Sequence, residues 1–185
     1  MRISRATFDR AMASAPSEVE RIQYVGALLG KATNSEPIIV GGSAIYLLAP
    51  SLEPSLDVDI ITDRSSAPNV VESWGFVRRN GRVWRREDLR LDIDLLREFR
   101  GSRKRSLLVE TPHGAVRVAC PEDMIVKRLA ELKHWPTTPA WRRRIGEQVT
   151  VLLGEYGGSL DEEYLTIRAR REEVEDLLAD FRKNS

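Results

Sequence analysis

The most informative pattern of apolar and polar positions lies in residues 38–61, which read IIVGGSAIYLLAPSLEPSLDVDII. A short apolar run, Ile38–Val40, stops at two consecutive glycines, and an apolar stretch at 44–49 ends at Pro50. Apolar and acidic residues alternate from Leu56 onward, and strict alternation predicts a strand. We therefore expect a buried strand, a short helix, a loop and a second strand, in this order.

Similar patterns predict the other elements. Helices are expected at 3–14, 17–30, 68–74, 121–130, from 141 onward and at 160–181; strand pairs at 76–79 with 83–86, around the turn Asn80-Gly81, and at 106–110 with 115–119; and a further strand at 89–95. This order predicts an α/β (α+β) fold with a small, mixed, twisted sheet flanked by helices and a C-terminal helical part. We expect a core at 1–120 and a helical region at 121–185, packed together as one unit.

Two pairs of aspartates occupy the predicted strands. Successive strand side chains point to opposite faces, so Asp57 and Asp59 share one face of their strand, and Asp92 and Asp94 share one face of theirs. Carboxylates two residues apart on one face repel each other and are difficult to explain as packing. A divalent cation bound between them would remove the repulsion, although a solvated acidic strand is the alternative.

The glycine pair between the first strand and the helix adds a second feature. Gly41 and Gly42 allow positive φ and the close approach of a ligand to the backbone. Ser43 stands where a helix would begin, with N–H groups and, we expect, a hydroxyl that face outward. Such a helix start is a phosphate site, so the sequence combines a phosphate cradle with paired carboxylates. These glycines do not indicate a P-loop NTPase, since no Walker lysine comes after them.

These residues resemble the signature of the DNA polymerase beta-type nucleotidyltransferase superfamily: Gly-Gly-Ser, a spacer, and then Asp-hydrophobic-Asp-hydrophobic. The resemblance implies two Mg²⁺ ions held by Asp57 and Asp59, with a third carboxylate on a neighbouring strand. Arg90-Leu91-Asp92-Ile93 is similar to the polymerase beta version of that strand, and Ile93-Asp94-Leu95-Leu96 to the version of small bacterial and archaeal members. We expect Asp94 to be the ligand and keep Asp92 as the alternative.

A second resemblance lies in residues 120–130, CPEDMIVKRLA, which are similar to the Pro-Glu-Asp-Leu-Ile-x-x-Lys-Leu-x-Ala segment of AbiEii-like nucleotidyltransferases. These include toxin components of toxin–antitoxin systems, which implies an antitoxin or other partner protein. The resemblance implies that Lys127 binds phosphate; a solvent-facing lysine is the alternative. The family usually shows an Asp four or five residues after an Arg in the next helix, whereas here Glu147 and Gln148 follow Arg143, which puts an acidic role for that helix in doubt.

Composition indicates more about the cellular location of the protein than about its function. The 29 Lys and Arg against 28 Asp and Glu give a net charge of +1, so overall charge does not indicate nucleic-acid binding. A single cysteine, Cys120, excludes an internal disulfide and suits a reducing cytosol, so we expect a cytoplasmic protein. No apolar run approaches the roughly 20 residues of a membrane span, and the first ten residues contain no apolar signal core.

Taken together, the residues and the resemblance imply an enzyme that transfers a nucleoside monophosphate from a Mg–NTP to a hydroxyl. The acceptor is left open between RNA such as tRNA, a protein and a small molecule. The basic loop 100–105, RGSRKR, is either solvated surface or a contact for the triphosphate or the acceptor. Two alternatives remain: a non-catalytic nucleotide- or partner-binding module on the same scaffold, and an accessory protein that acts through its helical end.

Overall fold

The computed structural model describes residues 3–54, 57–62, 65–96, 105–136 and 138–183. The chain divides into two compact units, Met1–Ala119 and Cys120–Ser185, called unit 1 and unit 2 below. Each unit is described by itself.

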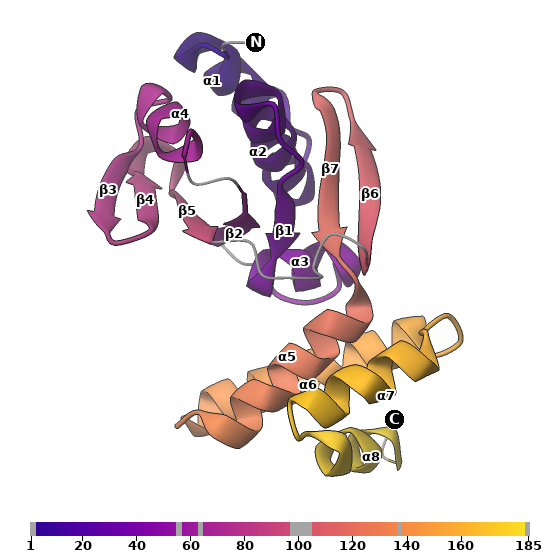
Figure 1. The fold of residues 1–185 in the computed structure, drawn as a ribbon. Coiled ribbons are helices and arrows are strands. Elements are labelled where there is room, and N and C mark those ends of the chain that lie inside the picture. Colours follow the sequence, from indigo (N-terminus) through magenta and orange to yellow (C-terminus); the bar gives the residue numbers. More distant parts are fainter. Residues whose placement is uncertain (1–2, 55–56, 63–64, 97–104, 137, 184–185) are drawn as a thin grey trace. The chain divides into compact units, whose positions relative to one another are not determined.

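Unit 1 is built on a seven-stranded mixed sheet (Figure 1). The strands lie in the order β3-β4-β5-β2-β1-β7-β6; β1 is antiparallel to β2 and parallel to β7, and β2 is parallel to β5. The elements are α1 (Arg5–Ser14), α2 (Glu18–Thr33), β1 (Ile38–Val40), α3 (Gly41–Leu48), β2 (Asp57–Ile61), α4 (Ala67–Ser73), β3 (Val77–Asn80), β4 (Val83–Arg86), a 3-10 turn (Glu87–Leu89), β5 (Leu91–Leu96), β6 (Ser106–Thr111) and β7 (Gly114–Ala119).

The two faces of the central strands differ in polarity. In the registers that join β1, β2 and β5, the residues Ile39, Ile60, Val58 and Ile93 fall on one face, and all four are buried. Helix α2 packs closely on this side. Its Gly26 lies so near the sheet that a Cβ at this position would be 3.2 Å from the Ile39 Cδ1 atom. The alternating pattern of the strands thus builds a core on one face and leaves the aspartates on the other.

The N-terminal helix fixes the end of the sheet that carries β4. Phe8 of α1 stacks on Trp74 with ring centroids 4.4 Å apart and meets Phe76 edge-on at 5.7 Å. The buried guanidinium of Arg86 donates to the Trp74 carbonyl at 2.8 Å and also pairs with Asp9. Aromatic packing and a satisfied buried cation therefore hold the β3–β4 hairpin in place.

Unit 2 consists of helices (Figure 1). They are α5 (Pro121–His134), α6 (Pro139–Tyr156), α7 (Glu162–Arg171) and α8 (Glu175–Lys183). A buried polar group joins α5 to α7: Asp123 accepts hydrogen bonds from the Tyr164 hydroxyl at 3.0 Å and from Arg168 Nε at 2.8 Å. Cys120 is buried beside Asp123, and burial raises the pKa of its thiol. None of the helices in the described ranges is long and apolar enough to cross a membrane.

The predicted fold class is confirmed, while some element boundaries differ. Helix α3 begins at Gly41, three residues earlier than the apolar stretch indicated. Asn80 is still part of β3 and pairs with Val83, so the predicted Asn80-Gly81 turn is wrong by one residue and the turn is Gly81-Arg82. Leu56 and most of the basic loop, residues 100–104, lie outside the described residues.

Candidate functional site

The four aspartates of β2 and β5 lie on one face of the sheet. The two strands are parallel neighbours, and their register pairs Asp57 with Asp92 and Asp59 with Asp94. Side chains at paired positions of adjacent strands point to the same side, so this face carries two rows of carboxylates. The sequence predicts each pair separately; the register brings the two pairs together. We call this surface the acidic face.

The glycine turn meets the acidic face at Asp59. Residue Gly41 has φ +65, and a Cβ placed there would lie 1.8 Å from the Asp59 Oδ2 atom, so only glycine fits. Val40, just before the turn, is paired with Asp59 across β1 and β2. The N-terminus of α3 therefore begins directly beside a carboxylate, as the combination of cradle and carboxylates requires.

The orientation of Ser43 differs from the prediction. Its side chain is fully buried, and its hydroxyl donates to the backbone carbonyl of Asp57 instead of facing outward. Because α3 begins at Gly41, Ser43 is already inside the first turn of the helix, facing β2. The hydroxyl thus fastens the start of α3 to the strand that carries Asp57 and Asp59, and what Ser43 offers to an anion is its backbone N–H group.

Two arginines on the acidic face were missed by the sequence analysis. Arg85 Nη1 lies 3.0 Å from Asp92 Oδ2, and Arg82 Nε lies 2.9 Å from Asp94 Oδ2. They come from β4 and from the turn before it, and β4 is antiparallel to β5 with Arg85 opposite Asp92. Only the register of β4 against β5 places Arg85 on this face, and no pattern within residues 83–86 contains it.

The carboxyl of Asp57 responds to this environment. Its pKa is raised above the ordinary value of 3.8, first because the surrounding protein partly desolvates it, and next because of the negative charge of Asp92. A hydrogen bond with Asp92 and the charge of Asp94 act in the same direction, whereas Arg85 lowers the pKa. Asp57 is therefore coupled most strongly to Asp92 among the carboxylates.

The donor set fits a hard divalent cation, but the side chains do not form a ready metal site. Carboxylate oxygens are the ligands that Mg²⁺ prefers, and the buried Asp92 Oδ1 atom has no hydrogen-bond partner among the described residues. Within the same residues, no group of three His, Cys, Asp or Glu side chains is placed so as to hold an ion. Arg82 and Arg85 would have to release Asp94 and Asp92 before these oxygens could turn to a cation.

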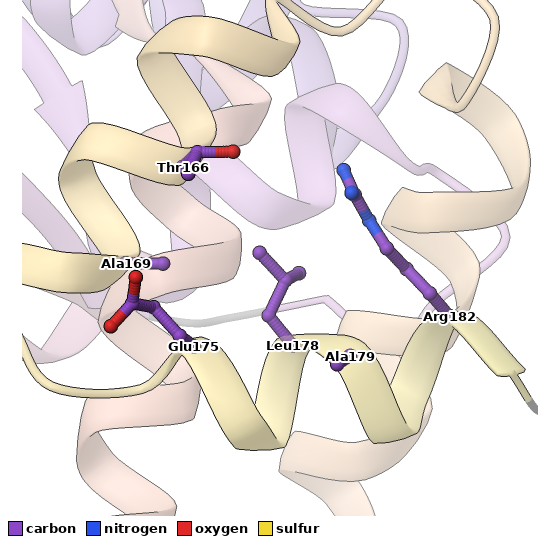
Figure 2. Close-up of a pocket in the computed structure, with 6 residues that line it drawn as sticks. All are labelled: Thr166, Ala169, Glu175, Leu178, Ala179 and Arg182. Carbon is purple, nitrogen blue, oxygen red and sulfur yellow. The ribbon is translucent and has the colours of Figure 1, made fainter.

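The remaining predicted residue, Lys127, is exposed on α5 of unit 2. Its contact with a nucleotide stays a prediction. Unit 2 also contains an open pocket of about 360 Å³ between α7 and α8 (Figure 2). Its lining consists of Thr166, Ala169, Glu175, Leu178, Ala179 and Arg182. The two charged groups at this pocket already have partners, since Glu175 pairs with Arg170 and Arg182 with Glu162, and the pocket contains none of the residues that the sequence indicated.

The chain is similar along nearly its whole length to the solved structure of an antigenic nucleotidyltransferase-like protein from Paracoccidioides brasiliensis, with a TM-score of 0.57. The match covers 91% of this chain and 94% of that chain, at 14% sequence identity. The chain has a nucleotidyltransferase-like fold. No protein-family model matches the sequence, and the comparison with curated proteins finds no match. At 14% identity the similarity shows the fold alone. The roles proposed for individual residues therefore rest on the geometry of the acidic face and the glycine turn.

Proposed function

We propose that the chain is a metal-dependent nucleotidyltransferase that transfers a nucleoside monophosphate from a Mg–NTP to a hydroxyl group of RNA, a protein or a small molecule. The observation that carries this proposal is the parallel register of β2 and β5, which aligns Asp57 with Asp92 and Asp59 with Asp94. The close approach of Gly41 to Asp59 supports it, because carboxylates and a helix N-terminus then lie side by side. Metal ligands and phosphate-binding N–H groups are the parts that such a reaction needs.

The residues of the acidic face and of the glycine turn have different roles in this proposal. Asp57 and Asp59, with one aspartate of β5, would hold two Mg²⁺ ions, which supply positive charge to the attacking and leaving oxygens of an in-line displacement. The backbone N–H groups of Gly42 and Ser43 at the start of α3 would bind the β- and γ-phosphates. The acceptor hydroxyl loses its proton to solvent as its oxygen attacks the α-phosphorus, the bond from that phosphorus to the bridging oxygen of the β-phosphate breaks, and pyrophosphate leaves.

For the third carboxylate we now favour Asp92 over Asp94. Asp92 lies directly opposite Asp57 in the register of β2 and β5, and among the carboxylates its negative charge raises the pKa of Asp57 most. A cation shared by Asp57 and Asp92 would relieve this repulsion. Asp94, one residue pair further along the strands, would then act indirectly.

The arginines give this site a defined resting state. Arg85 and Arg82 neutralise Asp92 and Asp94 when no cation is present. Release of these carboxylates to Mg²⁺ would free Arg82 and the Nη1 side of Arg85, while Arg85 Nε stays paired with Glu87 at 2.9 Å; the freed N–H donors suit phosphate oxygens. We therefore expect Arg85 to contribute to triphosphate affinity.

The finer parts of the proposal rest on the resemblance noted from the sequence. They are membership of the AbiEii-like branch, a toxin–antitoxin role with a partner protein, and phosphate binding by Lys127; the proposed cytoplasmic location rests instead on the single cysteine. The exposed position of Lys127 on α5 is compatible with phosphate binding.

A second candidate function is a non-catalytic nucleotide-binding module on the same scaffold. The observation that favours it is the pairing of Asp92 and Asp94 with arginines, together with the lack of a ready three-ligand group in the described part of the chain. If the arginines stay on the carboxylates, Mg–NTP could bind at the glycine turn without being used.

Transfer of label from α-³²P-NTPs tests the proposal. The chain is incubated with Mg²⁺ and each labelled NTP in a cell lysate, and labelled RNA, protein and small molecules are separated. We expect label transfer by the wild type and its loss in Asp59→Asn by at least the roughly 10–100-fold that follows removal of an outer-shell metal partner. Asp92→Asn should lose more activity than Asp94→Asn.

The matched control is Asp176→Asn, which removes an exposed carboxylate from the first turn of α8 and should leave transfer unchanged. Transfer by Asp59→Asn at the wild-type rate would refute the site. Mg–NTP binding by the wild type without any labelled product would favour the non-catalytic module.

A further inference from the structure

Unit 2 contains a local concentration of positive charge. Its residues, 120–185, include 11 Lys and Arg against 13 Asp and Glu, so the unit as a whole is slightly acidic. The stretch 132–146, LKHWPTTPAWRRRIG, nevertheless contains one Lys and three Arg and no acidic residue, and it contains two of the four tryptophans of the chain. The overall charge of unit 2 does not explain this local excess of cations.

The structure presents these residues at one end of the α5–α6 pair. Trp135 follows the last turn of α5 and is 64% exposed, and Trp141 in the first turns of α6 is 37% exposed. Arg142 Nη1 donates to the Leu132 carbonyl at 3.2 Å, which fastens the start of α6 to the end of α5. We define the Trp–Arg surface as Trp135, Trp141, Arg142, Arg143 and Arg144.

The arginines of this surface differ from those of the acidic face in their partners. Among the described residues, no carboxylate pairs with Arg143 or Arg144, whereas Arg82 and Arg85 both pair with aspartates. The Arg144 guanidinium lies 5.7 Å from the centre of the Trp141 ring. That cation–π contact holds the guanidinium near the surface while its N–H donors stay open to an anion.

The start of α6 lacks the acidic residues that begin the other helices of unit 2. Helices α5, α7 and α8 each begin with two acidic residues in the first turn, which complement the positive end of the helix dipole. Helix α6 has no acid in its first turn, and Arg142, Arg143 and Arg144 follow at once. Arg142 ends the first turn and Arg143 and Arg144 lie in the second, so this end of α6 has cations and no acidic residue, and a bound polyanion would supply the missing negative charge.

The apolar side of α6 is already used within the unit. Ile145, Val149, Leu152 and Leu153 are buried, so the exposed side of α6 offers guanidiniums and an indole instead of an aliphatic stripe. An aliphatic stripe is what a partner helix or a lipid surface would need. Exposed aromatic rings beside phosphate-binding cations are the equipment for a single nucleic-acid strand, whose unpaired bases can stack.

We propose that the Trp–Arg surface binds a single strand of nucleic acid, with Arg143 and Arg144 on backbone phosphates and Trp135 stacked on a base. This binding requires neither a nucleotide nor a metal ion, so it does not depend on the proposed transferase activity. RNA and DNA share the phosphates and the bases that this surface contacts.

The experiment measures fluorescence anisotropy of a labelled 12-nucleotide single-stranded RNA, and of the DNA of the same sequence, with the full-length chain in EDTA. We expect Trp135→Ala to weaken binding about fivefold or more, because stacking on an aromatic ring contributes substantially per base. Arg143→Ala and Arg144→Ala should each weaken binding and each lower the slope of log Kd against log salt by about 1. Whether RNA or DNA binds more tightly identifies the strand.

The matched controls lie on α7 and remove the same kinds of group: Arg171→Ala removes an exposed cation, and Ile167→Ala shortens a side chain that is 40% exposed. Both should bind like the wild type, as should Asp59→Asn, which separates this proposal from the transferase site. No binding of either oligonucleotide, or equal losses in the α7 controls, would overturn the proposal. Tighter binding to phosphatidylglycerol vesicles with the same dependence on Trp135 and Arg143 would overturn it in favour of a membrane surface.

Discussion

At the scale of single residues, Asp57 decides how the acidic face behaves without a cation. Its carboxyl is partly desolvated and faces the negative charge of Asp92, and only Arg85 opposes these effects. A group in this position destabilises the folded state once it is ionised. A residue that destabilises the folded state in this way is typical of a ligand-binding or catalytic site.

The pH dependence of stability tests this reading of Asp57. Because its pKa in the folded state is raised above 3.8, the stabilising contribution is fully present below that pH and is lost as the pH rises through the raised value. Asp57→Asn should therefore melt at a higher temperature than the wild type at pH 7 in EDTA, and the difference should shrink toward pH 3.8.

Urea or thermal unfolding between pH 3.5 and about pH 7 measures this difference, since the window begins at the ordinary pKa. Addition of Mg²⁺ should reduce it, because a bound cation relieves the same repulsion. As a control, NMR titration of Asp92→Asn should show a lower pKa for Asp57. An Asp57→Asn variant that is less stable than the wild type at pH 7 in EDTA would contradict the reading.

At the scale of elements, the turn from β1 into α3 joins the cradle to the carboxylates. Gly41→Ala puts a Cβ 1.8 Å from Asp59 Oδ2 and forces a left-handed conformation on an L-residue. The conformation alone costs about 1–2 kcal/mol, and the displacement of Asp59 adds to it. We expect a lower free energy of unfolding, measured in urea, and weaker Mg–NTP binding.

The control for this substitution is Gly154→Ala on α6, where an added Cβ meets no atom within 4 Å. It should stabilise the chain by about 0.5–1 kcal/mol, since glycine is a poor helix former. Equal stability of Gly41→Ala and the wild type would mean that the turn tolerates a side chain and that Asp59 is not held against it.

These two elements also show what local sequence patterns predict and what they do not. The period of two within residues 57–61 and 91–96 places each pair of aspartates on one face, because this alternation is a property of a single strand. The pairing of Asp57 with Asp92 depends on the register between two strands separated by a helix and a hairpin, and no local pattern contains it.

The missed details have physical causes of the same kind. The helix after the glycine pair begins at Gly41, which turns the Ser43 hydroxyl toward the Asp57 carbonyl, and apolar content alone does not specify where a first turn starts. Arg85 lies on the acidic face because the register of β4 against β5 pairs it with Asp92, and a register between two strands is not contained in the pattern of either strand.

At the scale of the whole molecule, a net charge of +1 conceals two separate charged surfaces. Unit 1 carries the acidic face, four aspartates with two arginines, and unit 2 carries the Trp–Arg surface. Average charge therefore says little about the partners of this chain, because binding depends on local concentrations of charge. We propose that the acidic face binds a metal–nucleotide complex and that the Trp–Arg surface binds a polyanionic strand, and each proposal can be tested without the other.

The central claim is that the acidic face and the glycine turn of unit 1 bind a metal–nucleotide complex. Paramagnetic broadening of backbone amide NMR signals by Mn²⁺ in the presence of an NTP tests it most directly, since broadening falls off steeply with distance from the ion. We predict that the signals of Gly42, Ser43, Asp57, Asp59 and Asp92 broaden first and that Asp59→Asn abolishes the effect. Broadening centred on the α7–α8 pocket, or none in unit 1, would contradict the claim.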